Sequence, residues 1–157
     1  MSGGRTVNYS VHCTFKHMTG VLRYLREASS KIARELTSLD NVPEEQKNKL
    51  VEIHGRLAKL INDLTKVVLS LLEIYEGSVE FDREYLMSIQ ALLSTYRAEI
   101  EKVMIETRRI FEELRLKEET INAFTMDLLS CLGDIYCAEQ DHIPELTEKV
   151  KESNSNN

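Results

Sequence analysis

Apolar residues recur at a spacing of seven through residues 82–137, and the repeat keeps one phase throughout. This stretch contains no proline, and its only glycine is Gly133. A heptad sustained over this length predicts a long helix that packs against other helices along one face. Only Thr107 and Lys117 clearly break the apolar rule. The other positions of the repeat are Leu86, Ile89, Leu93, Tyr96, Ile100, Val103, Ile110, Leu114, Ile121, Phe124, Leu128, Cys131 and Ile135.

Two more helices are expected before this stretch. Steps of three and four between apolar residues predict one helix from about Cys13 to Leu39 and another from Pro43 to Glu76. Pro43 suits a helix start, where its missing N–H is not needed, and Gly77 suits a C-terminal cap. The second helix is apolar over a wide arc, so we expect it to touch two other helices. Its main stripe is Leu50, Ile53, Leu57, Leu60, Leu64, Val67, Leu71 and Ile74.

Short connections between these helices predict the fold class. Asp82 is the expected cap of the third helix, because Phe81 before it and Leu86 four positions after it can form a hydrophobic staple. Helices joined by short loops pack antiparallel. We therefore predict an all-α protein, an elongated antiparallel three-helix bundle or coiled coil. Gly20 is expected on the outer face of the first helix.

Residues 116–137 have two possible placements. The second helix has about 34 residues, and the third matches that length near Leu114. Beyond that point the chain either projects past the bundle or folds back as a fourth helix. Thr120 could cap a new helix, which favours folding back. The unbroken heptad and the absence of Gly and Pro favour a projecting helix, and this is the placement that we favour.

The two ends of the chain are expected to lie outside the bundle. Residues 1–10 are small and polar and are predicted to be a flexible arm, so that the bundle spans residues 11–137. Residues 138–157 are predicted to be an acidic tail. Pro144 should break the helix that precedes it, and a short helix from Pro144 to about Glu152 can follow.

Charge and cysteine content narrow the classes of function. The net charge of −6 argues against nucleic acid as the main partner. The charge is uneven, because residues 1–39 carry six Lys or Arg and only two Asp or Glu. The first residues have no apolar core of the kind that signal peptides carry, so we expect no signal peptide. No apolar run in the sequence is long enough to span a membrane, and the three cysteines are widely spaced. We expect an intracellular, cytoplasmic protein with reduced thiols.

Metal binding is the main chemical alternative, and we expect no metal and no cofactor. Cys131, Cys137 and His142 do not have the spacing of a zinc finger. A folded-back fourth helix would nevertheless bring them beside the start of the first helix, where His17 lies near Cys13 and another histidine, His12. The bland interpretation is stronger, because Cys131 falls on the apolar stripe and a buried cysteine is usually a small core residue.

The function predicted from these patterns is non-catalytic. We interpret the chain as a helical interaction or scaffold subunit of a multiprotein complex, which binds helical proteins or itself through coiled-coil surfaces. The alternative is a self-contained four-helix domain that binds a small ligand, a metal or a lipid. If residues 116–137 project, one helical face there is exposed and available to a partner. The predicted partner-binding residues are Ile121, Phe124, Leu128, Leu129, Leu132, Ile135 and Tyr136.

Overall fold

The computed structural model describes residues 2–38, 42–77 and 82–155, with residues 2–10 and 150–155 described by their backbone only. Every regular element in this part of the chain is helical, which confirms the all-α prediction. No helix among these residues combines the length and apolarity needed to cross a membrane. The elements are α1 (Ser2–Ser38), α2 (Glu44–Tyr75), α3 (Arg83–Glu113), α4 (Glu118–Cys137), a π-helical segment (Ala138–His142) and α5 (Ile143–Ser155).

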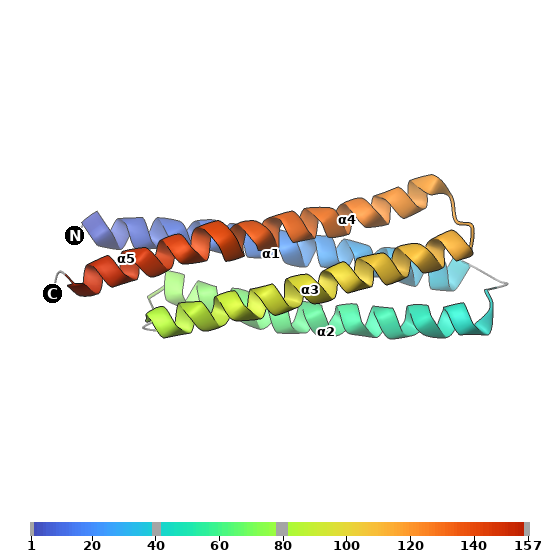
Figure 1. Ribbon diagram of the computed structural model, residues 1–157, viewed down its shortest axis with the longest axis horizontal. Helices are drawn as coiled ribbons and strands as arrows, with labels where there is room; N and C mark the ends of the chain where they lie inside the picture. Colours follow the sequence, from blue (N-terminus) through green and yellow to red (C-terminus); the bar gives the residue numbers. More distant parts are fainter. Residues whose placement is uncertain (1, 39–41, 78–81, 156–157) are drawn as a thin grey trace.

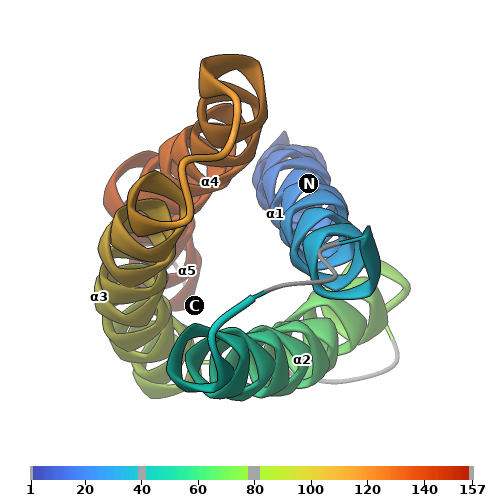
Figure 2. The ribbon, with the colours of Figure 1, turned by 90° about the vertical axis from the view of Figure 1, so that its right-hand side faces the viewer.

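Helices α1–α4 pack as an elongated antiparallel bundle (Figure 1). Helix α1 packs against α2 and α4, and α3 packs against the same two helices from the opposite corner. The end-on view shows the four corners of this arrangement (Figure 2). The π-helical segment and α5 continue the line of α4, and α5 contacts α1 and α3. As predicted, α2 touches two other helices.

Residues 116–137 fold back, so the favoured prediction of a projecting helix is wrong. Helix α3 ends at Glu113, and the chain reverses through Arg115, which has a left-handed φ of 55°. The N–H of Leu116 donates to the carbonyl of Phe111 (3.1 Å), and that of Arg115 donates to Glu112 (3.0 Å). These bonds form a Schellman motif, which usually has glycine at the left-handed position. Arginine stands there instead, so the turn lacks its usual sequence signal.

Burial of one face of α4 explains why the chain closes. Ile121, Phe124, Leu128 and Ile135 all point into the shared core, and the last three are fully buried. The ring of Phe124 meets that of Phe111 edge to face, with centroids 5.3 Å apart. A projecting helix would leave these four apolar side chains in water, at a cost of about 1.5–3 kcal/mol each. Removing their apolar surface from water therefore favours the closed four-helix bundle.

The predicted helix ends and core stripes are largely confirmed. The Asp82 side chain accepts a hydrogen bond from the Tyr85 N–H (2.9 Å), and Gly77 adopts a left-handed φ of 77°. Phe81, the expected staple partner, lies outside the described residues. All eight stripe positions of α2 are buried. Thr107, which breaks the apolar pattern, is also fully buried, and its hydroxyl has no hydrogen-bond partner. Thr120 does not cap α4, because the N-cap is Lys117.

Residues 138–149 bury side chains in the core of the bundle, whereas the sequence predicted an acidic tail with a possible short helix at residues 138–157. Ala138, Ile143 and Leu146 are fully buried. Pro144 does not end the continuous helical path from α4 to α5, because the turn before it widens into a π-helix. There the N–H of Ile143 donates to the carbonyl of Ala138, five residues back. The wider turn carries the chain past a residue that has no N–H of its own.

The first helix begins earlier than predicted. Helix α1 starts at Ser2, whereas the spacing of apolar residues predicted a start near Cys13, and the backbone of residues 2–10, the predicted flexible arm, is helical. Gly20 does not lie on an outer face. It is half-buried and faces the Asp134 side chain of α4, which a Cβ atom at this position would strike. The glycine therefore allows the Asp134 carboxylate to approach the backbone of α1 closely.

We predict that Arg115→Gly stabilises the protein by up to about 1 kcal/mol, because glycine adopts a left-handed φ without strain. The matched control is Glu101→Gly, an exposed position in the middle of α3, where loss of helix propensity should cost about 1 kcal/mol. Urea unfolding measures both changes. A loss of stability in Arg115→Gly comparable to that of the control would contradict the turn.

Candidate functional site: the outward face of α4

The outward face of α4 is uncharged over four turns. Met126, Leu129 and Tyr136 are 58%, 46% and 50% exposed. Their spacing of three and seven places them on one side of the helix, with Gly133 between the last two. Every position classed as exposed between residues 121 and 137 is uncharged. These positions are Asn122, Ala123, Met126, Leu129, Gly133 and Tyr136.

Two acidic residues of α4, Asp127 and Asp134, are turned toward α1 and paired there, whereas Glu118 and Glu119 in its first turn are exposed. Lys31 of α1 forms an ion pair with Asp127, in which both side chains are mostly buried. His17 Nδ1 lies 3.0 Å from Asp134 Oδ1. Gly20 makes room for the second carboxylate. These contacts place the carboxylates of Asp127 and Asp134 against α1, which belongs to the basic part of the chain, and keep them off the outward face of residues 122–136.

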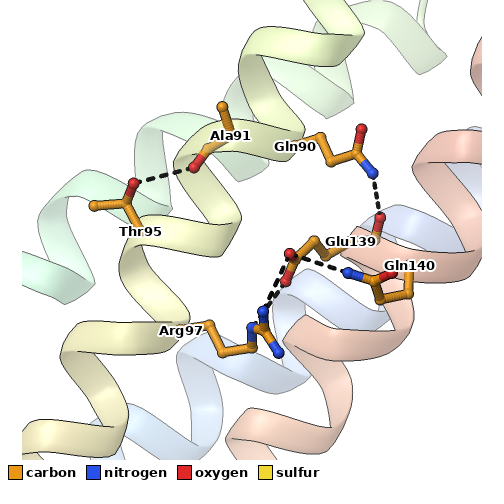
Figure 3. A network of polar contacts seen from close by, with 6 residues as sticks. All are labelled: Gln90, Ala91, Thr95, Arg97, Glu139 and Gln140. Carbon is orange, nitrogen blue, oxygen red and sulfur yellow. Dashed lines mark hydrogen bonds and ion pairs between the residues drawn. The ribbon is translucent and has the colours of Figure 1, made fainter.

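A buried ion pair holds the π-helical segment, which follows α4, against α3. Arg97 Nε of α3 lies 3.0 Å from Glu139 Oε2, and the Glu139 side chain is only 5% exposed (Figure 3). Gln140 donates a further hydrogen bond to the Glu139 carboxylate (3.2 Å). The Arg97 guanidinium also lies over the ring of Tyr136, 5.6 Å from its centroid. Arg97 therefore neutralises a buried carboxylate and supports an exposed aromatic ring of the outward face.

The π-helical segment explains why Gln90 takes part in this network. In an α-helix, the Glu139 carbonyl would accept the N–H of Ile143, but that N–H donates to Ala138 instead. In a π-helix it would accept from residue 144, which is proline and has no N–H. The side chain of Gln90 donates to this carbonyl at 2.9 Å (Figure 3). The amide of Gln90 thus satisfies a buried acceptor that the helix cannot.

Two histidines meet where α1 passes the π-helical segment. The rings of His17 and His142 are stacked with centroids 4.8 Å apart. This proximity was expected for a folded-back chain, but Cys131 is fully buried in the core. Burial, with the nearby charge of Asp134, raises the pKa of the Cys131 thiol to about 12. The described residues contain no group of three or more His, Cys, Asp or Glu side chains placed to hold a metal ion.

The predicted partner-binding residues divide between the core and the surface. Ile121, Phe124, Leu128 and Ile135 are buried, so the exposed strip expected of a projecting helix does not exist in the closed bundle. Leu132 is half-buried, and Leu129 and Tyr136 are exposed. Sequence reasoning missed Met126 and Gly133. The signal in the sequence was that α4 is apolar on both of its sides, whereas a surface helix needs apolar residues only on the side that faces the core.

We predict that Arg97→Met destabilises the bundle by about 3–5 kcal/mol, because the buried Glu139 carboxylate loses its cation. The double variant Arg97→Met with Glu139→Gln should recover most of this loss. Arg108→Met, which breaks an exposed pair with Glu112 (3.1 Å), is the control and should cost less than about 1 kcal/mol. Urea unfolding of the four proteins tests this, and equal losses at Arg97 and Arg108 would contradict it.

The histidine contact predicts a loss of stability in mild acid. Burial and the neighbouring His17 lower the pKa of His142, and the charges of Glu145 and Asp141 only partly oppose this effect. The folded state therefore favours neutral His142, so its contribution to stability is present above about pH 6.5 and is lost as the pH falls through the lowered pKa. His142→Gln should reduce the difference in unfolding free energy between pH 7.5 and pH 5.5. An unchanged difference would show that His142 is not responsible.

No protein-family model matches the chain, and comparisons with curated proteins and with solved structures find no significant match. The function must therefore be argued from the geometry of the chain itself. The feature that stands out is the uncharged outward face of α4 over residues 122–136, next to Asp127 and Asp134, which pair with Lys31 and His17 of α1.

Proposed function

We propose that this protein is a non-catalytic helical interaction subunit, which binds a helix of a partner protein through the outward face of α4. The observation that carries the proposal is the exposure of Met126, Leu129 and Tyr136 on a helical face without charge. Surface helices normally present charged residues to water on the side opposite the core. An apolar face on a fully formed helix usually marks an interaction site.

The spacing of these side chains suits a helix as the partner. Met126, Leu129, Gly133 and Tyr136 follow one another in steps of three and four, which forms a ridge along α4. The Gly133 side of α4 is open, with no atom near the position of a Cβ, so a partner backbone can approach there closely. Methionine and tyrosine are enriched in protein interfaces, where charged residues are depleted. An amphipathic helix lying along this ridge would cover all three side chains.

The face is also held in place before any partner arrives. Tyr136 lies under Arg97, and Arg97 is fixed in turn by its ion pair with Glu139. A side chain that is already ordered loses less conformational entropy on binding. The ring of Tyr136 and the backbone of α4 are ordered before binding. Association therefore costs less conformational entropy than it would at an unstructured surface.

The closed bundle gives partial support to the alternative function. The return of α4 closes a four-helix bundle, and the inner face of α4 packs against the other helices of the same chain. A small-ligand site has less support, because the hollow of about 650 Å³ between α2 and α3 is an open groove. Small-ligand sites usually enclose most of the ligand surface.

We propose that this interaction takes place inside the cell, in the cytoplasm. Cys13, Cys131 and Cys137 are all free thiols in the structure. Free thiols are typical of proteins in a reducing compartment. The net charge of −6 favours a protein partner over a nucleic acid.

We predict that Met126→Asp with Leu129→Asp abolishes partner association and leaves the bundle folded, because two charges would enter the centre of the face. The matched control is Val51→Asp with Leu69→Asp on α2, where both apolar side chains are 53% exposed. Affinity purification of the tagged protein at native level, with quantitative mass spectrometry, measures association, and thermal melting measures the fold. Equal partner recovery with both double variants would contradict the proposal.

A third double variant separates the inner face of α4 from the outer one. Phe124→Asp with Leu128→Asp places charges in the fully buried core and should unfold the protein, with a cost of several kcal/mol. Circular dichroism melting measures this cost. A folded protein that has only lost its partner would show that these residues face a partner and not the core.

A further inference from the structure

A second candidate surface lies between α2 and α3, on the side of the bundle opposite the contact between α1 and α4. These two helices make the sparsest contact of the four neighbouring pairs, and hollows open along the line between them. Two hollows, of about 650 Å³ and 380 Å³, share Asp63 and Tyr96 and so form one continuous depression. We call this depression the α2–α3 groove. It is lined by residues of 56–70 on α2 and 85–102 on α3.

The floor of the α2–α3 groove is apolar. Leu60, Val67 and Ile89 lie at its base and are almost fully buried. Leu92, which is 43% exposed, and Tyr96, which is half-buried, form the wall on the α3 side. Along α2 the groove runs for about 21 Å, at about 1.5 Å per residue. This is the length of about four turns of helix, with an apolar track along its centre.

The charge along the groove is positive, although the whole chain carries −6. Lys59, Lys66 and Lys102 line it, and none of the three has an ion-pair partner among the residues that the structure describes. Arg56 forms ion pairs with Glu99 (2.8 Å) and with Glu106 (2.6 Å), which lies beside the groove. The residues that line the groove are four cations (Arg56, Lys59, Lys66 and Lys102) and two carboxylates (Asp63 and Glu99).

We propose that the α2–α3 groove binds an acidic amphipathic helix of a partner protein. The apolar side of that helix covers the track of Leu60, Val67 and Leu92. Its carboxylates lie beside Lys59, Lys66 and Lys102, where the ammonium groups attract them. The open, elongated shape fits a helix better than a small molecule, which needs a more enclosed site. This surface is separate from the outward face of α4, so the two sites can be tested independently.

The test starts from an unbiased library of 20-residue helical peptides displayed on phage and selected on the full-length chain. Selected peptides are synthesised and their affinity is measured by fluorescence anisotropy. We expect peptides with Asp and Glu along one side and apolar residues along the other. Their affinity should fall as the salt concentration rises, because the attraction between exposed charges is screened.

The decisive variant reverses the groove charges with Lys59→Glu, Lys66→Glu and Lys102→Glu. All three side chains are exposed, so the bundle should stay folded, and circular dichroism melting checks this. Binding of the selected peptides should weaken by about tenfold or more. The neutral variant with glutamine at these positions should show an intermediate loss, which keeps the test valid if charge reversal affects the fold.

The matched control makes the same change in net charge on α1, with Lys16→Glu, Arg26→Glu and Arg34→Glu, all at exposed positions. Peptide binding to this control should stay within about twofold of the wild type at moderate salt, because the reversed charges lie away from the groove. Equal weakening in both charge-reversed proteins would overturn the proposal, since it would report overall charge alone.

Three other outcomes would also overturn it. One is a selection that yields no peptide or only peptides without acidic residues. Another is binding that is lost in the Met126→Asp, Leu129→Asp variant and kept in the groove variant, which places the peptides on α4. The third is a dimer of the wild-type chain in sedimentation that the groove variant dissociates, which assigns the groove to a second copy.

Discussion

The return of α4 against α1 is the contact on which the rest of the structure depends. Helices α1, α2 and α3 each carry one apolar stripe, and the inner face of α4 closes the core that these stripes form. Phe124 and Leu128 occupy its centre, and Phe124 meets Phe111 edge to face at 5.3 Å. The turn that permits this has Arg115 in a left-handed conformation. Apolar burial by the whole of α4 outweighs the strain at that one residue, which is about 1–2 kcal/mol.

The same contact determines the character of the surface. Once α4 lies beside α1, Lys31 and His17 face Asp127 and Asp134 across the interface. Arg97 neutralises the buried Glu139 on the other flank. Asp127 and Asp134 therefore face the inside of the bundle, and the outward side of α4 over residues 122–136 is left without charge. The proposed interaction site is a consequence of how the fourth helix is fixed, and it does not require a separate functional element.

The sequence predicted the elements more reliably than their connection. The α2 stripe, the Asp82 cap and the Gly77 terminus follow from apolar spacing and local backbone chemistry, and the structure has all three. The reversal after Glu113 could not be predicted, because a Schellman turn built without glycine lets the heptad run on in phase. Continuation past Pro144 depends on a π-helical turn and on Gln90, a residue 49 positions away from the carbonyl it satisfies. Such compensation by distant residues leaves no local signal in the sequence. That Leu129 and Tyr136 are exposed, while their apolar neighbours on α4 are buried, could be seen only once the fold was known.

The contact between His17 and His142 tests the closed arrangement most directly, because these residues are distant in sequence and their rings are stacked at 4.8 Å. Nuclear Overhauser spectroscopy of the monomeric protein measures it through the imidazole ring protons. Closure of α4 against α1 predicts a cross-peak between the two rings that survives dilution of a labelled chain with unlabelled chain. The absence of this cross-peak, together with cross-peaks from His142 only to residues near it in sequence, would contradict closure and would restore the projecting helix.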